Sequence, residues 1–202
     1  MSDMKNLEVD FPSLEPEPDE YAARFQALVK ERNVDVFLSE FQQETDRAAA
    51  VLGAAYLDRA LEHLLRKRLL GGNKLKDELL NTDKPLGSFS ARIKVAFAVG
   101  SLHKAAYHDL EIIRRIRNEF AHQTMGFSFQ RPEIVSRCEQ LQLPVWFSQI
   151  GLPATDSRIR FNYAVTILAT LLIPAAEAMG GTIKSMVGES EPWNTARPEQ
   201  GS

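Results

Sequence analysis

Residues 103–120 read HKAAYHDLEIIRRIRNEF, and this stretch decides the fold class because its apolar residues recur at helical spacing. Leu110, Ile113, Ile116 and Phe120 are separated by three, three and four positions, and Ala106 precedes Leu110 by four. At about 100° per residue, these four side chains fall on one face of an α-helix. The stretch therefore predicts an amphipathic helix from His103 to Phe120 that packs against a core.

Two charged residues fall within that apolar arc. With Ala106 set at 0°, Arg117 lies near about +20° and Asp109 near about −60°. A charged side chain aimed at a core is costly unless it is paired. We therefore expect Arg117 to meet a specific partner. Either it is a buried anchor, capping carbonyls or pairing with a carboxylate such as Asp109 or Glu62, or it lines a cleft and binds an anion such as phosphate.

Helical periodicity continues on both sides of this stretch, so we predict an all-α, antiparallel bundle of four to five main helices. Before the 103–120 helix, we expect a helix over Asp19–Arg32, a helical tract over Val34–Leu70 that bends or breaks near Gly53, and a helix over Arg92–Val99 that starts from Ser88 or Ser90. After it, we expect a turn or strand-like segment at Gly126–Phe129 and a helix over Pro132–Leu141. The last helix is expected over Asp156–Met179, with a bend at Pro174 and an end at Gly180-Gly181.

The ends of the chain differ from its middle. Residues 1–18 are acidic and interrupted by prolines, and residues 188–202 are similar in composition. Such segments cannot bury enough apolar surface to order themselves. We predict disordered tails at 1–18 and 188–202, and a single helical domain over 19–187.

Composition excludes several classes of protein. The net charge of −3 is not that of a dedicated nucleic-acid binder. Cys138 is the only cysteine, so one chain holds neither a disulfide nor a cysteine-based zinc site. The histidines lack metal-binding spacing and no Gly-rich phosphate loop is present, so we expect no metal and no cofactor.

The N-terminus lacks a signal-peptide pattern, and the polar residues within Phe161–Met179 indicate a core helix, so we expect a cytoplasmic protein without a membrane span.

Residues at the end of the amphipathic helix also suggest a catalytic site. His122 follows Arg117 by five positions, or about 140° around a helix, so both face one site only if the helix ends or loosens near Ala121. An imidazole beside a guanidinium suits phosphodiester cleavage, because one moves a proton and the other stabilises charge on phosphorus. Asn118 would hold a phosphate or orient the imidazole.

The residues Arg117-Asn118-x-x-Ala121-His122 resemble the Arg-x4-6-His motif of the HEPN superfamily. The resemblance implies a helical bundle that is often dimeric. Active members are metal-independent ribonucleases in which two copies of the motif meet across the dimer. It would make Arg117, Asn118 and His122 catalytic residues, with RNA as the substrate.

The chain also resembles the mannitol-repressor-like (MltR/MtlR) family over roughly residues 34–180. The stretches that carry this resemblance are PLGSFSARI (85–93), YHDL (107–110), IIRRIRNEFAH (112–122) and FSF (127–129). The family implies a repressor of transcription. Asn118 stands where better-known mannitol repressors tend to have an acidic residue, and nothing in these stretches points to a sugar alcohol.

No helix-turn-helix pattern with a basic recognition helix is visible. The strongest basic clusters are Arg66-Lys67-Arg68 with Lys74 and Lys76, and Arg114-Arg115; the first is typical of a solvated helix end, where cations suit the helix dipole. Our first hypothesis is therefore a regulatory protein that acts through a protein partner, forms a homodimer and does not bind DNA directly. In it, Asp109, Arg92 and Arg117 form a structural or partner site. The alternative is the ribonuclease.

Overall fold

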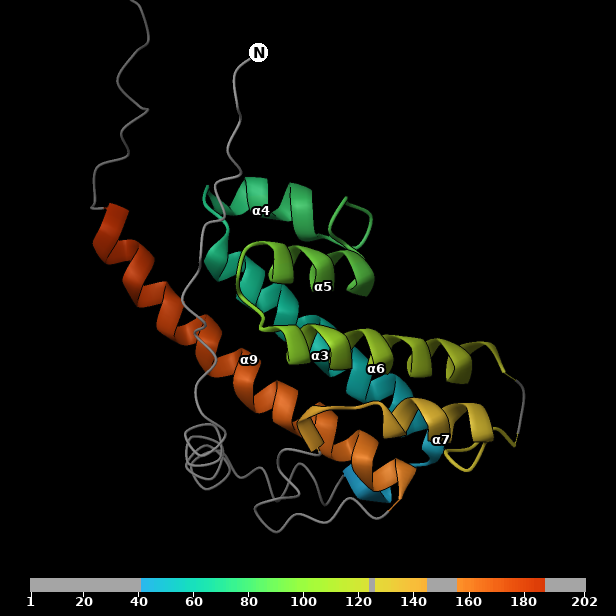
Figure 1. The fold of residues 1–202 in the computed structure, drawn as a ribbon. Helices are drawn as coiled ribbons and strands as arrows, with labels where there is room; N and C mark the ends of the chain where they lie inside the picture. Colours follow the sequence, from blue (N-terminus) through green and yellow to red (C-terminus); the bar gives the residue numbers. More distant parts are fainter. Residues whose placement is uncertain (1–40, 124–125, 145–155, 188–202) are drawn as a thin grey trace, which may run out of the picture.

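Every regular element of the structure, a computed structural model that describes residues 41–123, 126–144 and 156–187, is a helix (Figure 1). This confirms the predicted all-α fold. The elements are α3 (Asp46–Arg68), α4 (Asn73–Leu80), α5 (Phe89–Ala98), α6 (Lys104–His122), α7 (Pro132–Glu139) and α9 (Ser157–Val187).

Helix α3 is the centre of the described fold. Its most extensive partner is α9, and α6 and α5 pack against it as well (Figure 1). Hydrogen bonds at both ends of α3 show that α3 and α6 are antiparallel. Arg47, at the start of α3, donates at 2.7 Å to the carbonyl of Gln123, which directly follows α6. Arg68, at the end of α3, donates at 3.1 Å to the carbonyl of Val99, which lies in the connection before α6.

Side-chain caps set where three of these helices begin. Thr45 Oγ1 accepts from the Ala48 N–H, and Ser88 Oγ accepts from the Ala91 N–H, both at 3.2 Å. His103 Nδ1 accepts from the N–H of residue 106 at 3.3 Å. Each cap satisfies an N–H that the first helical turn leaves without a partner. Of the two serines considered for the start of α5, Ser88 is the cap.

The predicted break near Gly53 was wrong. Helix α3 runs through Gly53 without interruption, and the non-helical residues lie earlier, at Glu44 and Thr45. A Cβ atom at Gly53 would lie 2.8 Å from Phe41 Cζ and 3.1 Å from Val165 Cγ2. Gly53 therefore lets other side chains approach the backbone closely, a role of glycine that a helix-breaking rule does not recognise.

The end of the last helix was also predicted wrongly. Helix α9 continues through Pro174 and past Gly180-Gly181 to Val187. Proline removes one backbone hydrogen bond from a helix, but Leu172 and Ala176 on either side of it are buried, and this packing favours the continuous helix. Helix α7 ends at Glu139, two positions before the predicted Leu141.

The strand-like FSF segment is not a strand. Its two phenylalanines instead join α6 to α9 through aromatic packing. The Phe127 and Phe129 ring centres each lie 4.9 Å from that of Phe120, and Phe129 lies 5.1 Å from Phe161. Offset and edge-on pairs at these distances are favourable beyond the area they bury. This cluster fixes the last turn of α6, where the predicted motif lies.

The predicted helix over 19–32 and both predicted tails lie outside the described residues. Among the helices that are described, none is long and apolar enough to cross a membrane.

Candidate functional site

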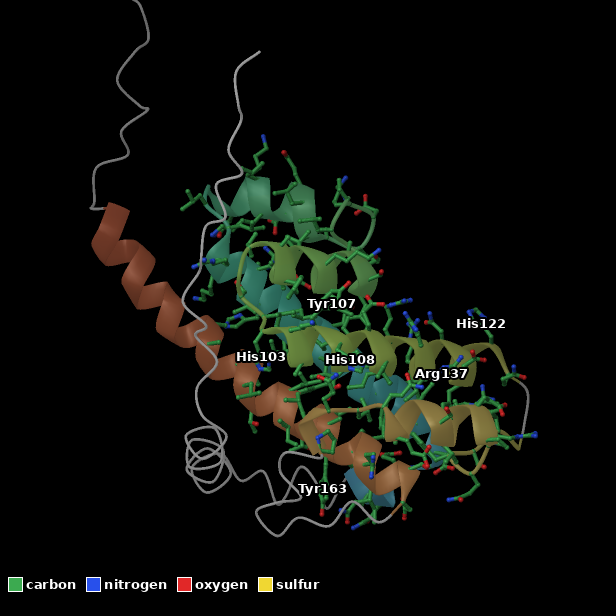
Figure 2. All side chains as sticks on the ribbon, in the orientation of Figure 1. His103, Tyr107, His108, His122, Arg137 and Tyr163 are labelled. Carbon is green, nitrogen blue, oxygen red and sulfur yellow. The ribbon has the colours of Figure 1, made fainter. Side chains whose placement is uncertain are left out.

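The last turn of α6 carries the three residues of the predicted motif. Arg117 and His122 are exposed and Asn118 is half-buried, and Arg117 Nη1 donates to Asn118 Oδ1 at 3.1 Å. Helix α6 stays helical through His122 (Figure 2), so Arg117 and His122 point about 140° apart. Within one chain, the structure does not bring them into one site.

The prediction that Arg117 is a buried anchor was wrong. The buried face of α6 includes Ala105 and Ile112 as well as the four residues that defined the predicted arc. These two shift the centre of the buried arc towards Asp109 and leave Arg117 at its edge. The carboxylates proposed as partners are bonded elsewhere: Glu62 to Arg66 and Arg92, and Asp109 to the backbone after α7.

The buried arginine is Arg92, which is only 4% exposed. Its Nε donates to the Leu86 carbonyl at 3.1 Å, and its Nη2 donates to the Leu80 carbonyl at 2.7 Å. Its Nη1 lies 2.7 Å from Asp58 Oδ1, and Nη2 lies 3.1 Å from Glu62 Oε2. One guanidinium thus ties α5 to α3 and to the connection between α4 and α5, using the planar array of donors that lysine lacks.

Asp58 is the carboxylate most affected by this arrangement. Burial raises the pKa of Asp58 above its ordinary value, and the hydrogen bond and charge of Arg92 partly oppose the rise. Arg117 is near enough for its charge to lower the Asp58 pKa slightly.

The ion pairs continue from Arg92 to the end of α4. Glu62 also accepts from Arg66 Nε at 2.9 Å, and Arg66 Nη1 lies 2.8 Å from Asp77 Oδ1. Lys76 Nζ donates to the Arg66 carbonyl at 2.7 Å. Pairs that share members hold one another in place more firmly than isolated surface pairs do. The α3–α4–α5 corner is therefore held by a connected set of charges.

Asp109 is the second buried charge, and its carboxylate is fully enclosed. Asp109 accepts from the Gln142 N–H at 2.9 Å, from the Leu143 N–H at 2.9 Å and from His108 Nδ1 at 3.1 Å. Burial raises the pKa of Asp109, and these hydrogen bonds oppose the rise. Asp109 of α6 therefore holds two consecutive backbone N–H groups that lie 33 and 34 residues further along the chain.

The sequence did not predict a set of polar contacts around Arg158 and Asp46. Arg158 of α9 lies 2.7 Å from Asp46 Oδ1 and donates to the Phe41 and Glu44 carbonyls, each at 3.0 Å. Asp46 also accepts from the Phe129 N–H at 2.9 Å. These partners are 83 to 117 residues apart in the chain, and no local pattern indicates such contacts.

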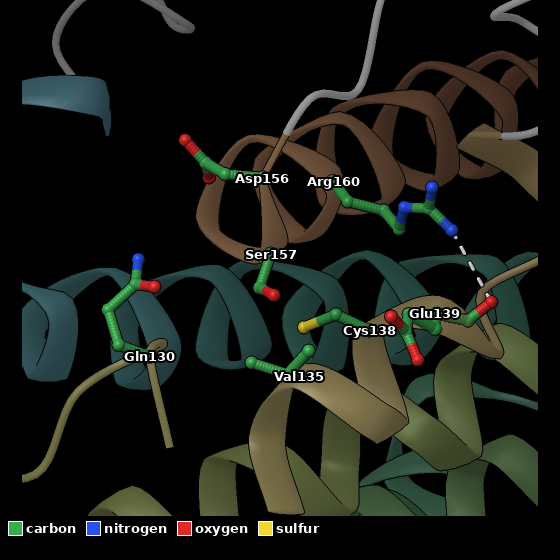
Figure 3. A pocket seen from close by; sticks show the side chains of 7 residues that line it. All are labelled: Gln130, Val135, Cys138, Glu139, Asp156, Ser157 and Arg160. Atoms are coloured by element: carbon green, nitrogen blue, oxygen red, sulfur yellow. Dashed lines mark hydrogen bonds between the residues drawn. The ribbon is translucent and has the colours of Figure 1, made fainter. Parts of the chain in front are cut away.

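A pocket of about 270 Å³ lies between α7 and the start of α9 (Figure 3). Its lining mixes two carboxylates, a guanidinium and small polar groups, and comprises Gln130, Val135, Cys138, Glu139, Asp156, Ser157 and Arg160. Burial raises the pKa of Cys138 to about 12, so its thiol is protonated at neutral pH and is not a nucleophile. The described residues contain no group of three or more His, Cys, Asp or Glu that could hold a metal ion.

The fold is shared with a solved protein. A chain of the X-ray structure of the MtlR–HPr complex from Escherichia coli superposes with a TM-score of 0.52 at 20% identity, covering 75% of this chain and 99% of that one. Two curated mannitol operon repressors, from two strains of Escherichia coli, are each 32% identical over 59 residues. That alignment covers 29% of this chain and 30% of each relative.

The family follows from a longer match. The family model described as "Mannitol repressor" (MtlR) matches residues 48–157, which is more than half of the chain. The protein belongs to the mannitol repressor family, as the sequence resemblance predicted. The matched range includes α4 to α7 and all but the first two residues of α3, and with them Arg92, Asp109 and the last turn of α6. The HEPN-type reading of that turn stays a prediction.

Proposed function

We propose that this protein regulates transcription indirectly, in the cytoplasm, by binding a protein partner instead of reading DNA. The main support is that most cations of the basic cluster Arg66-Lys67-Arg68, Lys74 and Lys76 already have partners within the fold. Arg66 is paired with Glu62 and Asp77, Arg68 donates to the Val99 carbonyl, and Lys76 donates to the Arg66 carbonyl. A DNA-binding surface needs several cations free to meet phosphates. Here three of the five candidates hold the fold together.

The proposed partner surface includes Arg117. Of the three residues predicted to form a structural or partner site, Arg92 and Asp109 are buried and Arg117 is exposed. Its neighbour Glu119 is already paired with Arg137 of α7 at 3.0 Å. An exposed arginine next to an apolar core is typical of residues that dominate protein interfaces.

We take HPr as the first partner to test, because the matched solved structure is a complex of an MtlR with HPr. We expect the full chain to bind the HPr of its own organism in a calorimetric titration, and Arg117→Ala to weaken the affinity roughly tenfold. Arg115→Ala is the matched control, since Arg115 is exposed on the opposite side of α6. Tight binding to a promoter fragment, together with no binding to HPr, would contradict the proposal.

The alternative function is a metal-independent ribonuclease that uses Arg117, Asn118 and His122. The exposure of Arg117 and His122 favours it, because an RNA substrate could reach both side chains. Because α6 is continuous, a shared site would need the same turn from a second chain, so this alternative depends on the homodimer that we also propose. Sedimentation velocity of the full chain tests the dimer.

RNA incubated with the protein in the presence of a chelator is expected to stay intact if the regulatory proposal is correct. Gel analysis of the RNA measures this, with His122→Ala and Arg115→Ala run in parallel. Cleavage by the natural chain that disappears in His122→Ala and persists in Arg115→Ala would establish the ribonuclease instead. Cleavage that survives His122→Ala would indicate a contaminant.

A further inference from the structure

His108, in the second turn of α6 (Figure 2), is a partly exposed imidazole held by a fully buried carboxylate. Its side chain is 38% exposed, and its Nδ1 lies 3.1 Å from Oδ1 of Asp109, which is 0% exposed. Both Asp109 oxygens already accept backbone hydrogen bonds, Oδ1 from Gln142 and Oδ2 from Leu143. Asp109 is therefore the acceptor, and Nδ1 of His108 carries the hydrogen.

This hydrogen bond fixes both the tautomer and the orientation of the ring. With the hydrogen on Nδ1, the Nε2 atom keeps an unshared electron pair, and the carboxylate behind the ring stabilises positive charge that develops when Nε2 reacts. Within residues 41–123, 126–144 and 156–187, no hydrogen bond or ion pair engages Nε2, and the atom is open to solvent. His108 is thus an oriented nucleophile.

The charges around the ring favour an anionic reactant. Lys104 precedes His108 by one turn on the same face of α6. It is exposed and pairs with no carboxylate in the described part of the chain. Glu111, the acid one turn after His108, lies 2.9 Å from Arg114 Nη2, which compensates its charge.

We propose that Nε2 of His108 accepts a phosphoryl group, which makes this histidine a phosphorylation site. The electron pair of Nε2 forms a bond to the phosphorus of a donor that carries a labile P–N bond or an acyl phosphate P–O bond. That donor bond breaks, and the departing group keeps its electron pair and takes a proton from solvent. The ring becomes an imidazolium whose Nδ1–H is held by Asp109, while Lys104 is placed to meet the phosphoryl oxygens.

Two other uses of an imidazole held by a carboxylate fit less well. As a general base it would activate a Ser or Cys nucleophile, but no such side chain is bonded to Nε2 among the described residues. As a metal ligand it would need companions, and the described residues hold no group of three or more His, Cys, Asp or Glu. The imidazole is therefore the nucleophile itself.

The site is independent of the function proposed above. His108 precedes Arg117 by nine positions, which places it about 180° around α6. Failure of one proposal therefore leaves the other standing.

The test incubates the full chain at neutral pH with phosphoramidate in one arm and acetyl phosphate in the other, and so also identifies the class of donor. Peptides are kept alkaline before mass spectrometry, because the bond between phosphorus and imidazole breaks in acid. We expect one phosphoryl group on His108. His63 and His122, which are exposed and pair with no carboxylate among the described residues, should stay unlabelled.

His108→Gln should lose the label, and the matched control His63→Gln should keep it. Circular dichroism checks that both variants fold. Lys104→Ala changes an exposed residue and should slow labelling by up to about fivefold, the effect of one exposed charge at short range. Equal labelling of the three histidines, a label that survives His108→Gln, or no label from either donor under conditions that phosphorylate free histidine would overturn the proposal.

Discussion

Arg92→Met is expected to lower the free energy of unfolding by about 3–5 kcal/mol, the usual cost of removing one member of a buried ion pair. The substitution leaves the Leu80 and Leu86 carbonyls without the donor they have in the fold, and it leaves Asp58 half-buried without its cation. Urea unfolding followed by circular dichroism measures the change. On a domain of this size the melting temperature should fall by roughly 10 °C.

Two further variants separate charge from geometry at this position. Arg92→Lys keeps the charge but has a single nitrogen, so it should recover only part of the loss. Arg114→Met removes an arginine that makes a partly exposed pair with Glu111, and should cost at most about 1 kcal/mol. If Arg92→Met costs no more than Arg114→Met, the buried cluster contributes little to stability.

Asp109→Asn is expected to destabilise the protein by about 1–3 kcal/mol, because the amide has one acceptor oxygen where the carboxylate has two. The NH₂ group would then face either the Gln142 or the Leu143 N–H. Hydrogen exchange provides a local measurement, since these two amides should exchange faster while amides in α3 change less. Asp83→Asn, at an exposed position, is the control and should stay within about 0.5 kcal/mol.

The Asp109 carboxyl also predicts how stability depends on pH. Burial raises its pKa in the folded protein above the ordinary 3.8. As pH falls through the raised value, the folded chain binds a proton before the unfolded chain does, so this group adds stability as pH falls towards 3.8. The stability difference between the natural protein and Asp109→Asn should therefore widen over that window. A difference that narrows there would show that the hydrogen bonds outweigh burial.

The sequence predicted most reliably the amphipathic helix that packs against the core. Apolar spacing predicted the helix at 103–120 and its buried residues, because burial along an amphipathic helix is set by the period of the backbone. The same spacing misplaced Arg117, since four residues defined the arc and Ile112 was left out of it. A position at the edge of a helix face depends on where the neighbouring helix ends, and a helical wheel does not contain that information.

The polar contacts could be predicted only in part. The position of Asp109 within the apolar arc indicated that it needed a partner, but its partners are backbone N–H groups after α7. Arg92 was selected by family resemblance, whereas its main carboxylate, Asp58, was not anticipated. Long-range partners of this kind are chosen by how helices pack, and a single sequence does not encode that packing in any local pattern.

The extensive contact between α3 and α9 has a consequence for synthesis on the ribosome. The Arg158–Asp46 pair joins residues 112 positions apart, and Gly53 of α3 packs against Val165 of α9. The main apolar surface of α3 is therefore covered only after α9, the last described helix, has been synthesised. A nascent or prematurely terminated chain that lacks α9 would present that surface to chaperones and proteases.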